Sequence, residues 1–119
     1  MILHDDQSDP DTELNYNILK GSTDFEGNPI SLIKIQSPDP KYVRRNLRRS
    51  KDAALGYVNF YICKGAVIIP EFGDEIADKN ARDIIADCYP DRIIEQINID
   101  WIALGGGGIH CCTQQEPLF

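Results

Sequence analysis

The chain has 119 residues, of which 42% are hydrophobic and 26% charged, and its formal net charge is −7. This balance fits one globular domain over residues 1–119 better than a disordered chain. No apolar run approaches the roughly 18 residues of a membrane span, and the acidic surplus disfavours nucleic acid as a partner. Because the N-terminus lacks the basic and apolar stretches of a signal peptide, we expect a cytoplasmic protein.

Two features of the composition qualify this picture. Residues 41–51 carry six Lys and Arg and no acid, whereas the rest of the chain holds 6 basic residues against 19 acidic ones. We interpret this segment as a solvated, mobile connection, with a patch for an anionic partner as the alternative. Without an export signal the cysteines are expected to be free thiols; they are Cys63, Cys88, Cys111 and Cys112.

The first third of the chain predicts a strand, a helix and a strand. Residues 1–3 resemble the end of a strand that starts abruptly. Asp9, followed by a proline, predicts the N-cap and first turn of a helix that ends near Gly21. A turn then leads into a strand over residues 30–35.

The middle of the chain predicts two strands joined by a tight turn. Residues 57–62 alternate strictly, with Val58, Phe60 and Ile62 on one face. Lys64 and Gly65 then form a two-residue hairpin turn. A second strand covers residues 66–69 and stops at a proline.

A helix and a further strand follow. Asp78 is the candidate N-cap of the helix, and a strand over residues 92–99 comes after it. The order from residue 57 onward is therefore strand, strand, helix, strand. The apolar stripe of the helix, which makes Cys88 a buried small hydrophobe, comprises Ala81, Ile84, Ile85 and Cys88.

Four glycines, residues 105–108, precede the chemically richest part of the chain. Glycine has no Cβ, so a bound molecule can lie against such a backbone, and we expect Gly107 and Gly108 to face a ligand. A phosphate loop and a dinucleotide fingerprint are excluded because the required Lys and Gly are absent. The alternation of Ile109, Cys111 and Thr113 predicts an extended segment rather than a flexible tether.

Three chemistries compete at His110, Cys111 and Cys112: a metal site, a redox pair and a nucleophile. Adjacent ligands fit poorly around tetrahedral zinc, and the cysteine pair lacks the two-residue spacer of redox motifs. A nucleophile is favoured, and no metal or cofactor is expected. In an extended segment only one of the two thiols faces a given pocket, and the sequence leaves open which one. His110 would point away from Cys111, so the general base must come from elsewhere.

Several blocks of the chain resemble the C-terminal part of agmatine deiminases and the related bacterial, Porphyromonas-type peptidylarginine deiminases. The matching blocks are residues 57–62 with the Gly65 turn, residues 67–74, residues 105–117 and residues 5–10. The departures are Gly56 in place of a residue that is often Ser, Lys64 in place of Asn, Cys112 in place of an aliphatic residue, and a shortened connection at residues 41–55.

The resemblance implies a partial pentein fold, an α/β propeller of five modules of which this chain would form about the last third. It also implies that Cys111 is the nucleophile and that Cys112 faces the other way. The thiolate would attack the guanidinium carbon of agmatine, release ammonia to leave a thiouronium, and yield N-carbamoylputrescine after hydrolysis. This reaction belongs to putrescine and polyamine biosynthesis.

The same resemblance places the family's catalytic His and Asp, in a Gly-His-x-Asp segment, and its guanidinium-binding carboxylates upstream of Met1. We therefore expect a chain that is incomplete and inactive alone, and that self-associates through strand edges or pairs with the missing modules. The alternatives are a non-catalytic remnant or interaction module of the same fold, or a deiminase for arginine or peptidyl arginine.

Overall fold

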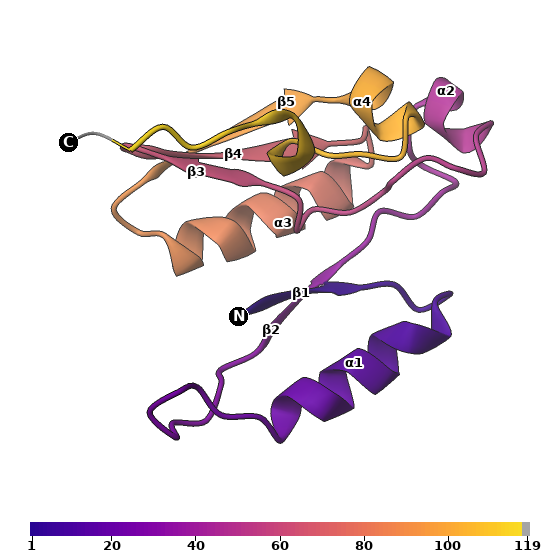
Figure 1. The fold of residues 1–119 in the computed structure, drawn as a ribbon. Coiled ribbons are helices and arrows are strands. Elements are labelled where there is room, and N and C mark those ends of the chain that lie inside the picture. The colour runs from indigo at the N-terminus through magenta and orange to yellow at the C-terminus, as the bar shows by residue number, and fades with distance from the viewer. Residues whose placement is uncertain (118–119) are drawn as a thin grey trace.

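The computed structural model describes residues 1–117, which form two small sheets with helices packed between and beside them (Figure 1). The N-terminal unit, residues 1–36, contains the parallel strands β1 (Ile2–Asp5) and β2 (Ile33–Gln36), connected through helix α1 (Pro10–Lys20). As predicted, Asp9 is the N-cap, with its carboxylate accepting from the backbone N–H of Asp11, and the helix ends at Gly21. The predicted strand at residues 30–35 begins three residues later than expected.

The second sheet has the order β3-β4-β5 and belongs to the C-terminal unit, residues 57–117. Its strands are β3 (Tyr61–Cys63), β4 (Ala66–Glu71) and β5 (Ile93–Asn98). β3 runs antiparallel and β5 parallel to β4, which helix α3 (Glu75–Cys88) makes possible by crossing between β4 and β5. Gly65 forms the predicted hairpin turn with φ of +81°, which glycine adopts without strain. The predicted order of strand, strand, helix, strand is confirmed.

The predicted strand over residues 57–62 is wrong over most of its length. Only its last two residues belong to β3, and Tyr57 and Val58 lie in a turn. Tyr57 is fully buried, and its hydroxyl donates to Asp78 Oδ1 over 2.7 Å. This tertiary hydrogen bond holds the main chain away from the sheet, so the alternating sequence does not form a ladder.

The predicted N-cap of α3 is also wrong by one turn. Asp74 caps the helix by accepting from the backbone N–H of Ala77, and Asp78 lies within the helix. Asp78 is buried and accepts from the backbone N–H groups of Phe72 and Gly73 as well as from Tyr57, which satisfies its carboxylate. Within the apolar stripe two residues are buried and two, including Cys88, are half-buried: Ala81, Ile85, Ile84 and Cys88.

The basic segment is not merely a solvated connection. It contains the short helix α2 (Arg45–Arg48), and Val43 and Leu47 are fully buried in the core. Arg44 is half-buried and pairs with Asp100 and Glu71. Its guanidinium therefore links this segment to the last residue of β4, Glu71, and to Asp100, which follows β5.

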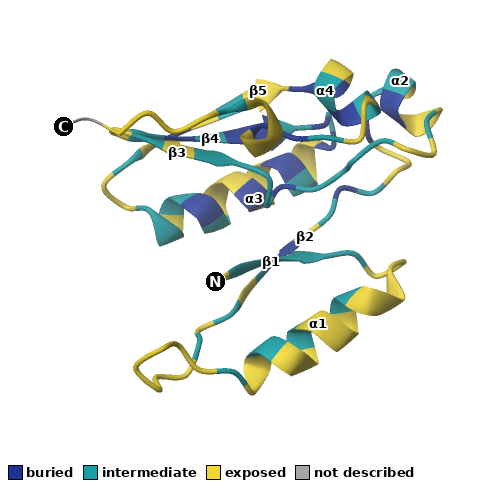
Figure 2. Ribbon diagram, in the orientation of Figure 1, coloured by how far each residue is buried: buried dark blue, intermediate teal, exposed yellow. Residues whose placement is uncertain are grey.

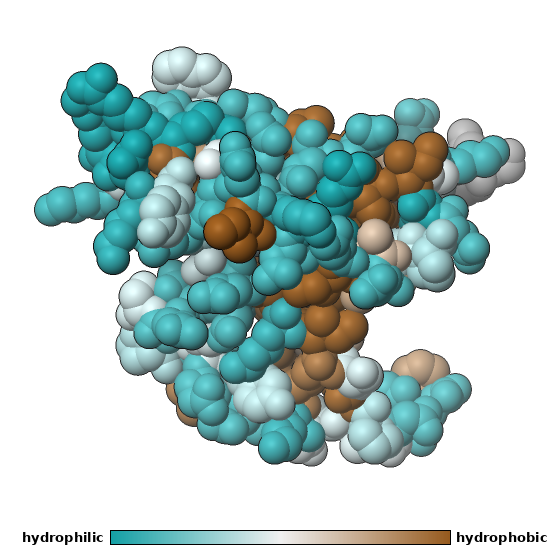
Figure 3. Space-filling view, turned by 180° about the vertical axis from the view of Figure 1, so that it is seen from behind, coloured by the Kyte–Doolittle hydropathy of each residue, from teal (hydrophilic) through white to brown (hydrophobic). Residues whose placement is uncertain are grey.

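The core lies between the second sheet and α3 and reaches β2 on the other side of the helix (Figure 2). Tyr57 and Phe72 are its largest members, with ring centroids 5.4 Å apart. Apolar side chains also reach the surface on the rear face of the molecule (Figure 3). A hollow of about 410 Å³ lies where the two units meet; its lining includes Met1, Ile2, Ile33, Val58, Phe60 and Tyr89.

Candidate functional site

The candidate nucleophile lies on a short turn that follows the four glycines. Helix α4 (Asp100–Leu104) leads into the glycines, and His110–Cys112 form a single turn of 3-10 helix. The predicted extended segment is therefore wrong, and strict alternation does not decide which way each thiol points. Cys111 and Cys112 are both exposed. Ile109 is buried and anchors the turn.

A side chain that lies 52 positions away in sequence touches Cys111 directly. The amide Nδ2 of Asn59 donates to Cys111 Sγ over 3.1 Å. The Oδ1 of the same amide accepts from the backbone N–H of His110 over 2.8 Å. Asn59 therefore bridges the turn after Tyr57 to the backbone and the sulfur of the candidate site.

The side chain of Asn59 packs closely against the backbone of Gly108. A Cβ on Gly108 would lie 2.4 Å from Cγ and 2.6 Å from Cβ of Asn59, distances that real side chains do not reach. At Gly107 a Cβ would make ordinary contacts, the nearest at 3.7 Å. Part of the reason for glycine at position 108 is therefore packing against Asn59, which the sequence interpretation did not foresee.

The pKa of Cys111 lies below its ordinary value. The largest cause is the hydrogen bond from the Asn59 amide, followed by backbone hydrogen bonding from Gly108. Both stabilise the anionic sulfur, because a dipole that donates to a thiolate is more favourable than one that donates to a thiol. The thiolate is the nucleophilic form of cysteine, so the local geometry favours reactivity at this position.

A part-buried and a buried contact hold the elements that carry these groups. Arg44 Nε donates to both carboxylate oxygens of Asp100 at 2.8 Å, which fixes the first residue of α4. Tyr57 and Asp78 fix the turn that carries Asn59. The site is thus supported from both ends, although Cys111 itself is open to solvent.

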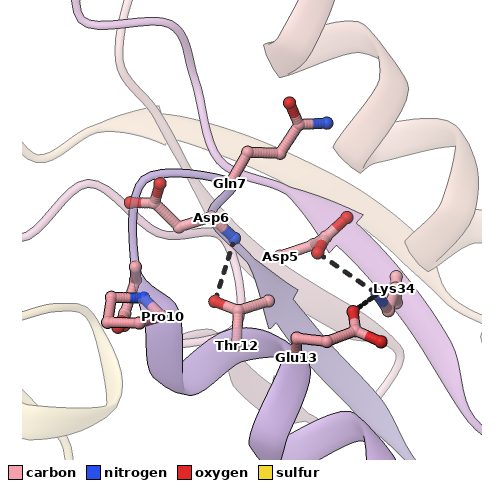
Figure 4. Close-up of a pocket in the computed structure, with 8 residues that line it drawn as sticks. Asp5, Asp6, Gln7, Pro10, Thr12, Glu13 and Lys34 are labelled. Carbon is pink, nitrogen blue, oxygen red and sulfur yellow. Dashed lines mark hydrogen bonds and ion pairs between the residues drawn. The ribbon is translucent and has the colours of Figure 1, made fainter.

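A second, acidic hollow lies at the end of β1 and the start of α1 (Figure 4). Its volume is about 440 Å³, and Cys111 is not part of its lining. Lys34 Nζ already reaches into it, 3.4 Å from Asp5 Oδ1 and 3.8 Å from Glu13 Oε2. Ser8 donates to Asp6 and lowers the pKa of that carboxyl. The hollow is therefore an internally paired polar cluster.

The remaining predicted features are placed as follows. The side chain of His110 is exposed, and its Nε2 lies 3.3 Å from Nε2 of Gln115. Among residues 1–117 no three His, Cys, Asp or Glu side chains are arranged to hold a metal ion. No helix in the same range is long and apolar enough to cross a membrane.

Sequence reasoning missed Asn59 and Arg44 as parts of the site. The alternating pattern predicts a strand over residues 57–62 and indicates no special role for Asn59 within it. Its one signal was its membership of the block of residues 57–62 that carries the family resemblance. Arg44 stands in a run of six basic residues, and charge alone does not separate it from the others.

The profile of the Porphyromonas-type peptidyl-arginine deiminase family matches residues 2–117 of this chain. The chain belongs to this family. Its mixed α/β arrangement is that of about one third of the deiminase structures it matches.

Individual proteins that this chain resembles carry the name agmatine deiminase. A Listeria monocytogenes protein named "Putative agmatine deiminase 2" is 36% identical, over 95% of this chain and 35% of its own length. The agmatine deiminase of Enterococcus faecalis superimposes with a TM-score of 0.81 at 29% identity, over 98% of this chain and 36% of that one. The Campylobacter jejuni agmatine deiminase, 20% identical with a TM-score of 0.68 over 95% of this chain and 33% of its own, shows the same fold. The chain spans about a third of the length of these relatives.

Proposed function

We propose that this chain carries the nucleophile of a guanidine deiminase, Cys111, and that the reaction is the conversion of agmatine to N-carbamoylputrescine and ammonia. The observation that carries the proposal is an exposed thiol whose sulfur accepts from Asn59 and whose pKa is lowered. Membership of the deiminase family and the names of the relatives support the same chemistry.

The reaction requires a thiolate and a planar cation. Sγ of Cys111 forms a bond to the guanidinium carbon, and one amino group leaves as ammonia after accepting a proton. Water then adds to the thiouronium carbon, the C–S bond breaks, and the thiol and the carbamoyl product separate. A lowered thiol pKa favours the first step, whereas the proton transfers require an acid–base group.

The family resemblance implies that this acid–base group and the guanidinium-binding carboxylates lie in the part of the protein that precedes Met1. We infer that residues 1–119 form the last modules of a five-module pentein propeller and do not turn over substrate alone. The exposed isoleucines on strands β3 and β5 and the apolar hollow between the units are suitable contact surfaces for the other modules. In their absence we expect concentration-dependent self-association through strand edges, which size-exclusion chromatography at several concentrations measures.

The decisive experiment supplies the upstream part. The upstream two-thirds of the Enterococcus faecalis agmatine deiminase are fused to this chain, and ammonia release from agmatine is measured for the fusion and for the chain alone. We expect release from the fusion only. Cys111→Ala should abolish it and Cys112→Ala should preserve it. Release that survives Cys111→Ala would refute the assignment of the nucleophile.

The same fusion distinguishes the alternatives. Because the family is described by peptidyl-arginine deimination, free arginine and a blocked arginine peptide are assayed beside agmatine. A preference for the peptide would replace agmatine as the substrate. A folded fusion that releases no ammonia from any of the three would favour a non-catalytic remnant or interaction module.

A further inference from the structure

The amide of Asn59 contacts the candidate nucleophile without any part in the bond-making steps. It occupies a fixed orientation, because the backbone N–H of His110 can only donate and must face the amide oxygen. The NH₂ side of the amide therefore faces Cys111 Sγ, 3.1 Å away. The planar amide of Asn59 thus fixes the position of both the sulfur and the turn that carries it.

We propose that Asn59 is the positioning residue of Cys111: its amide NH₂ donates to the sulfur and favours the thiolate form, and its amide oxygen accepts from the backbone N–H of His110 and fixes the turn. The proposal rests on the proposed function only in taking Cys111 as the nucleophile. Asn59 transfers no proton, because a neutral amide does not titrate in water.

The electrostatics at the sulfur support this role. The contributions that lower the pKa of Cys111 come from neutral groups: the Asn59 amide first, then the backbone at Gly108 and at Cys111 itself. Two titratable side chains flank the thiol in sequence, His110 and Cys112. Neither is among these contributions, and the His110 ring lies against Gln115. The thiolate is therefore stabilised by oriented dipoles rather than by an imidazolium.

Gly108 provides an independent way to disturb the same contact. A Cβ at this position would lie 2.7 Å from Nδ2 of Asn59 and closer still to Cβ and Cγ, so Gly108→Ala must displace the amide. Asn59→Asp is the complementary change. An aspartate of the same shape still accepts from the His110 N–H, but it offers no donor to the sulfur and adds a negative charge beside it.

The test measures thiol ionisation in the full chain without any substrate. The rate of alkylation of Cys111 by iodoacetamide is followed against pH in a Cys112→Ser background. Trypsin places Cys63, Cys88 and Cys111 in three different peptides, because Lys64, Arg82 and Arg92 separate them. Mass spectrometry therefore reports each thiol separately, and the two half-buried cysteines monitor the integrity of the fold.

We expect Asn59→Asp and Gly108→Ala each to slow alkylation of Cys111 at neutral pH by about three- to tenfold, the range of one lost hydrogen bond. The midpoint of the pH profile should move upward in both. The matched substitutions Asn17→Asp and Gly21→Ala, on the exposed side and at the end of α1, should leave rate and midpoint unchanged. Alkylation of Cys63 and Cys88 should be the same in all variants.

A midpoint equal to the parent's in either folded variant would overturn the proposal, since a merely structural asparagine has no reason to control thiol ionisation. This outcome is separable from failure of the proposed function. If the fusion releases no ammonia while the midpoint still shifts, Asn59 positions a thiol that is not a deiminase nucleophile. If ammonia is released and the midpoint does not shift, only the role of Asn59 is wrong.

Discussion

The N-terminal and C-terminal units differ in how much of their own surface they bury. In the N-terminal unit only Ile35 is buried, and helix α1 has no buried residue at all (Figure 2). The C-terminal unit contains most of the core, including Tyr57, Phe72 and Ile85. One unit is thus stabilised from within and the other depends on what it contacts.

This difference explains where the candidate chemistry lies. Asn59 and Cys111 contact each other within the unit that has a core, and the turn before Asn59 is held by the buried hydrogen bond between Tyr57 and Asp78. The N-terminal unit offers instead a paired acidic hollow and an exposed helix. A site needs rigid support for its geometry, which only the C-terminal unit supplies.

The two units should differ most in how much free energy of unfolding they lose when one large apolar side chain is removed. Phe72→Ala deletes a fully buried side chain, which we expect to lower the free energy of unfolding by about 3–5 kcal/mol. Ile18→Ala on α1 removes a side chain that is 59% exposed and should change it by less than about 0.5 kcal/mol. Urea unfolding followed by circular dichroism measures both. Equal losses would show that α1 is covered in solution.

The N-terminal unit contributes one fully buried side chain to the core. Ile35 on β2 belongs to the core cluster where β2 meets α3. We expect Ile35→Ala to lower the free energy of unfolding by about 2–4 kcal/mol and to speed hydrogen exchange in β1 and α1 more than in β4. Ile33→Ala, on the same strand but 37% exposed, is the matched control. Uniformly faster exchange would mean that the two units unfold together.

We expect acid to weaken the part-buried ion pair of Arg44 and Asp100 more than the exposed ion pair of Lys79 and Asp83. Burial alone would raise the pKa of Asp100, but hydrogen bonds from Arg44 and Asn46 outweigh it and hold that pKa below the ordinary value of 3.8. The pair therefore stabilises the fold above that value, and its contribution is lost as pH falls through the lower folded-state pKa.

We expect Asp100→Asn to lower the free energy of unfolding at pH 7 by about 2 kcal/mol and to make the remaining loss below pH 4 shallower. Asp83→Asn, in the exposed pair with Lys79, should change it by less than about 0.5 kcal/mol. Thermal unfolding between pH 2 and pH 7 provides the measurement. An unchanged acid profile in Asp100→Asn would exclude this carboxylate as a source of acid sensitivity.

The sequence predicted the elements whose stability is local. Strands β4 and β5, the Gly65 turn and most of α3 follow from side-chain period and turn chemistry, and the structure contains them. The turn at Tyr57 has the same alternating pattern as a strand, but a hydrogen bond to Asp78 overrides that pattern. The sequence does not decide the N-cap of α3, because Asp74 and Asp78 are both suitable caps. Only the backbone N–H groups around them determine which one caps the helix.

For the candidate site the sequence predicts a chemistry, a cysteine nucleophile, but not the geometry around it. The residue types after the glycines favour a cysteine nucleophile but leave Cys111 and Cys112 open, and the family resemblance implies Cys111. The alternation of Ile109, Cys111 and Thr113 predicts an extended segment, but residues 110–112 form a single turn of 3-10 helix, which is too short to leave a pattern of its own in the sequence. Its contact with Asn59 spans 52 positions, and no local pattern encodes a pair so distant.

The smallest expected difference concerns the N-caps of α1 and α3, both of which are aspartates. Asp9 accepts only from its own helix, whereas buried Asp74 accepts from Ala77 and also from the backbone N–H of Asp39. Asp9→Ala should lower the free energy of unfolding by about 0.5 kcal/mol and Asp74→Ala by about 1–2 kcal/mol. Replacement by Asn at each position is the control, because Asn retains the capping oxygen. If the two alanine variants lose equal amounts in urea unfolding, the link to Asp39 contributes nothing beyond the cap itself.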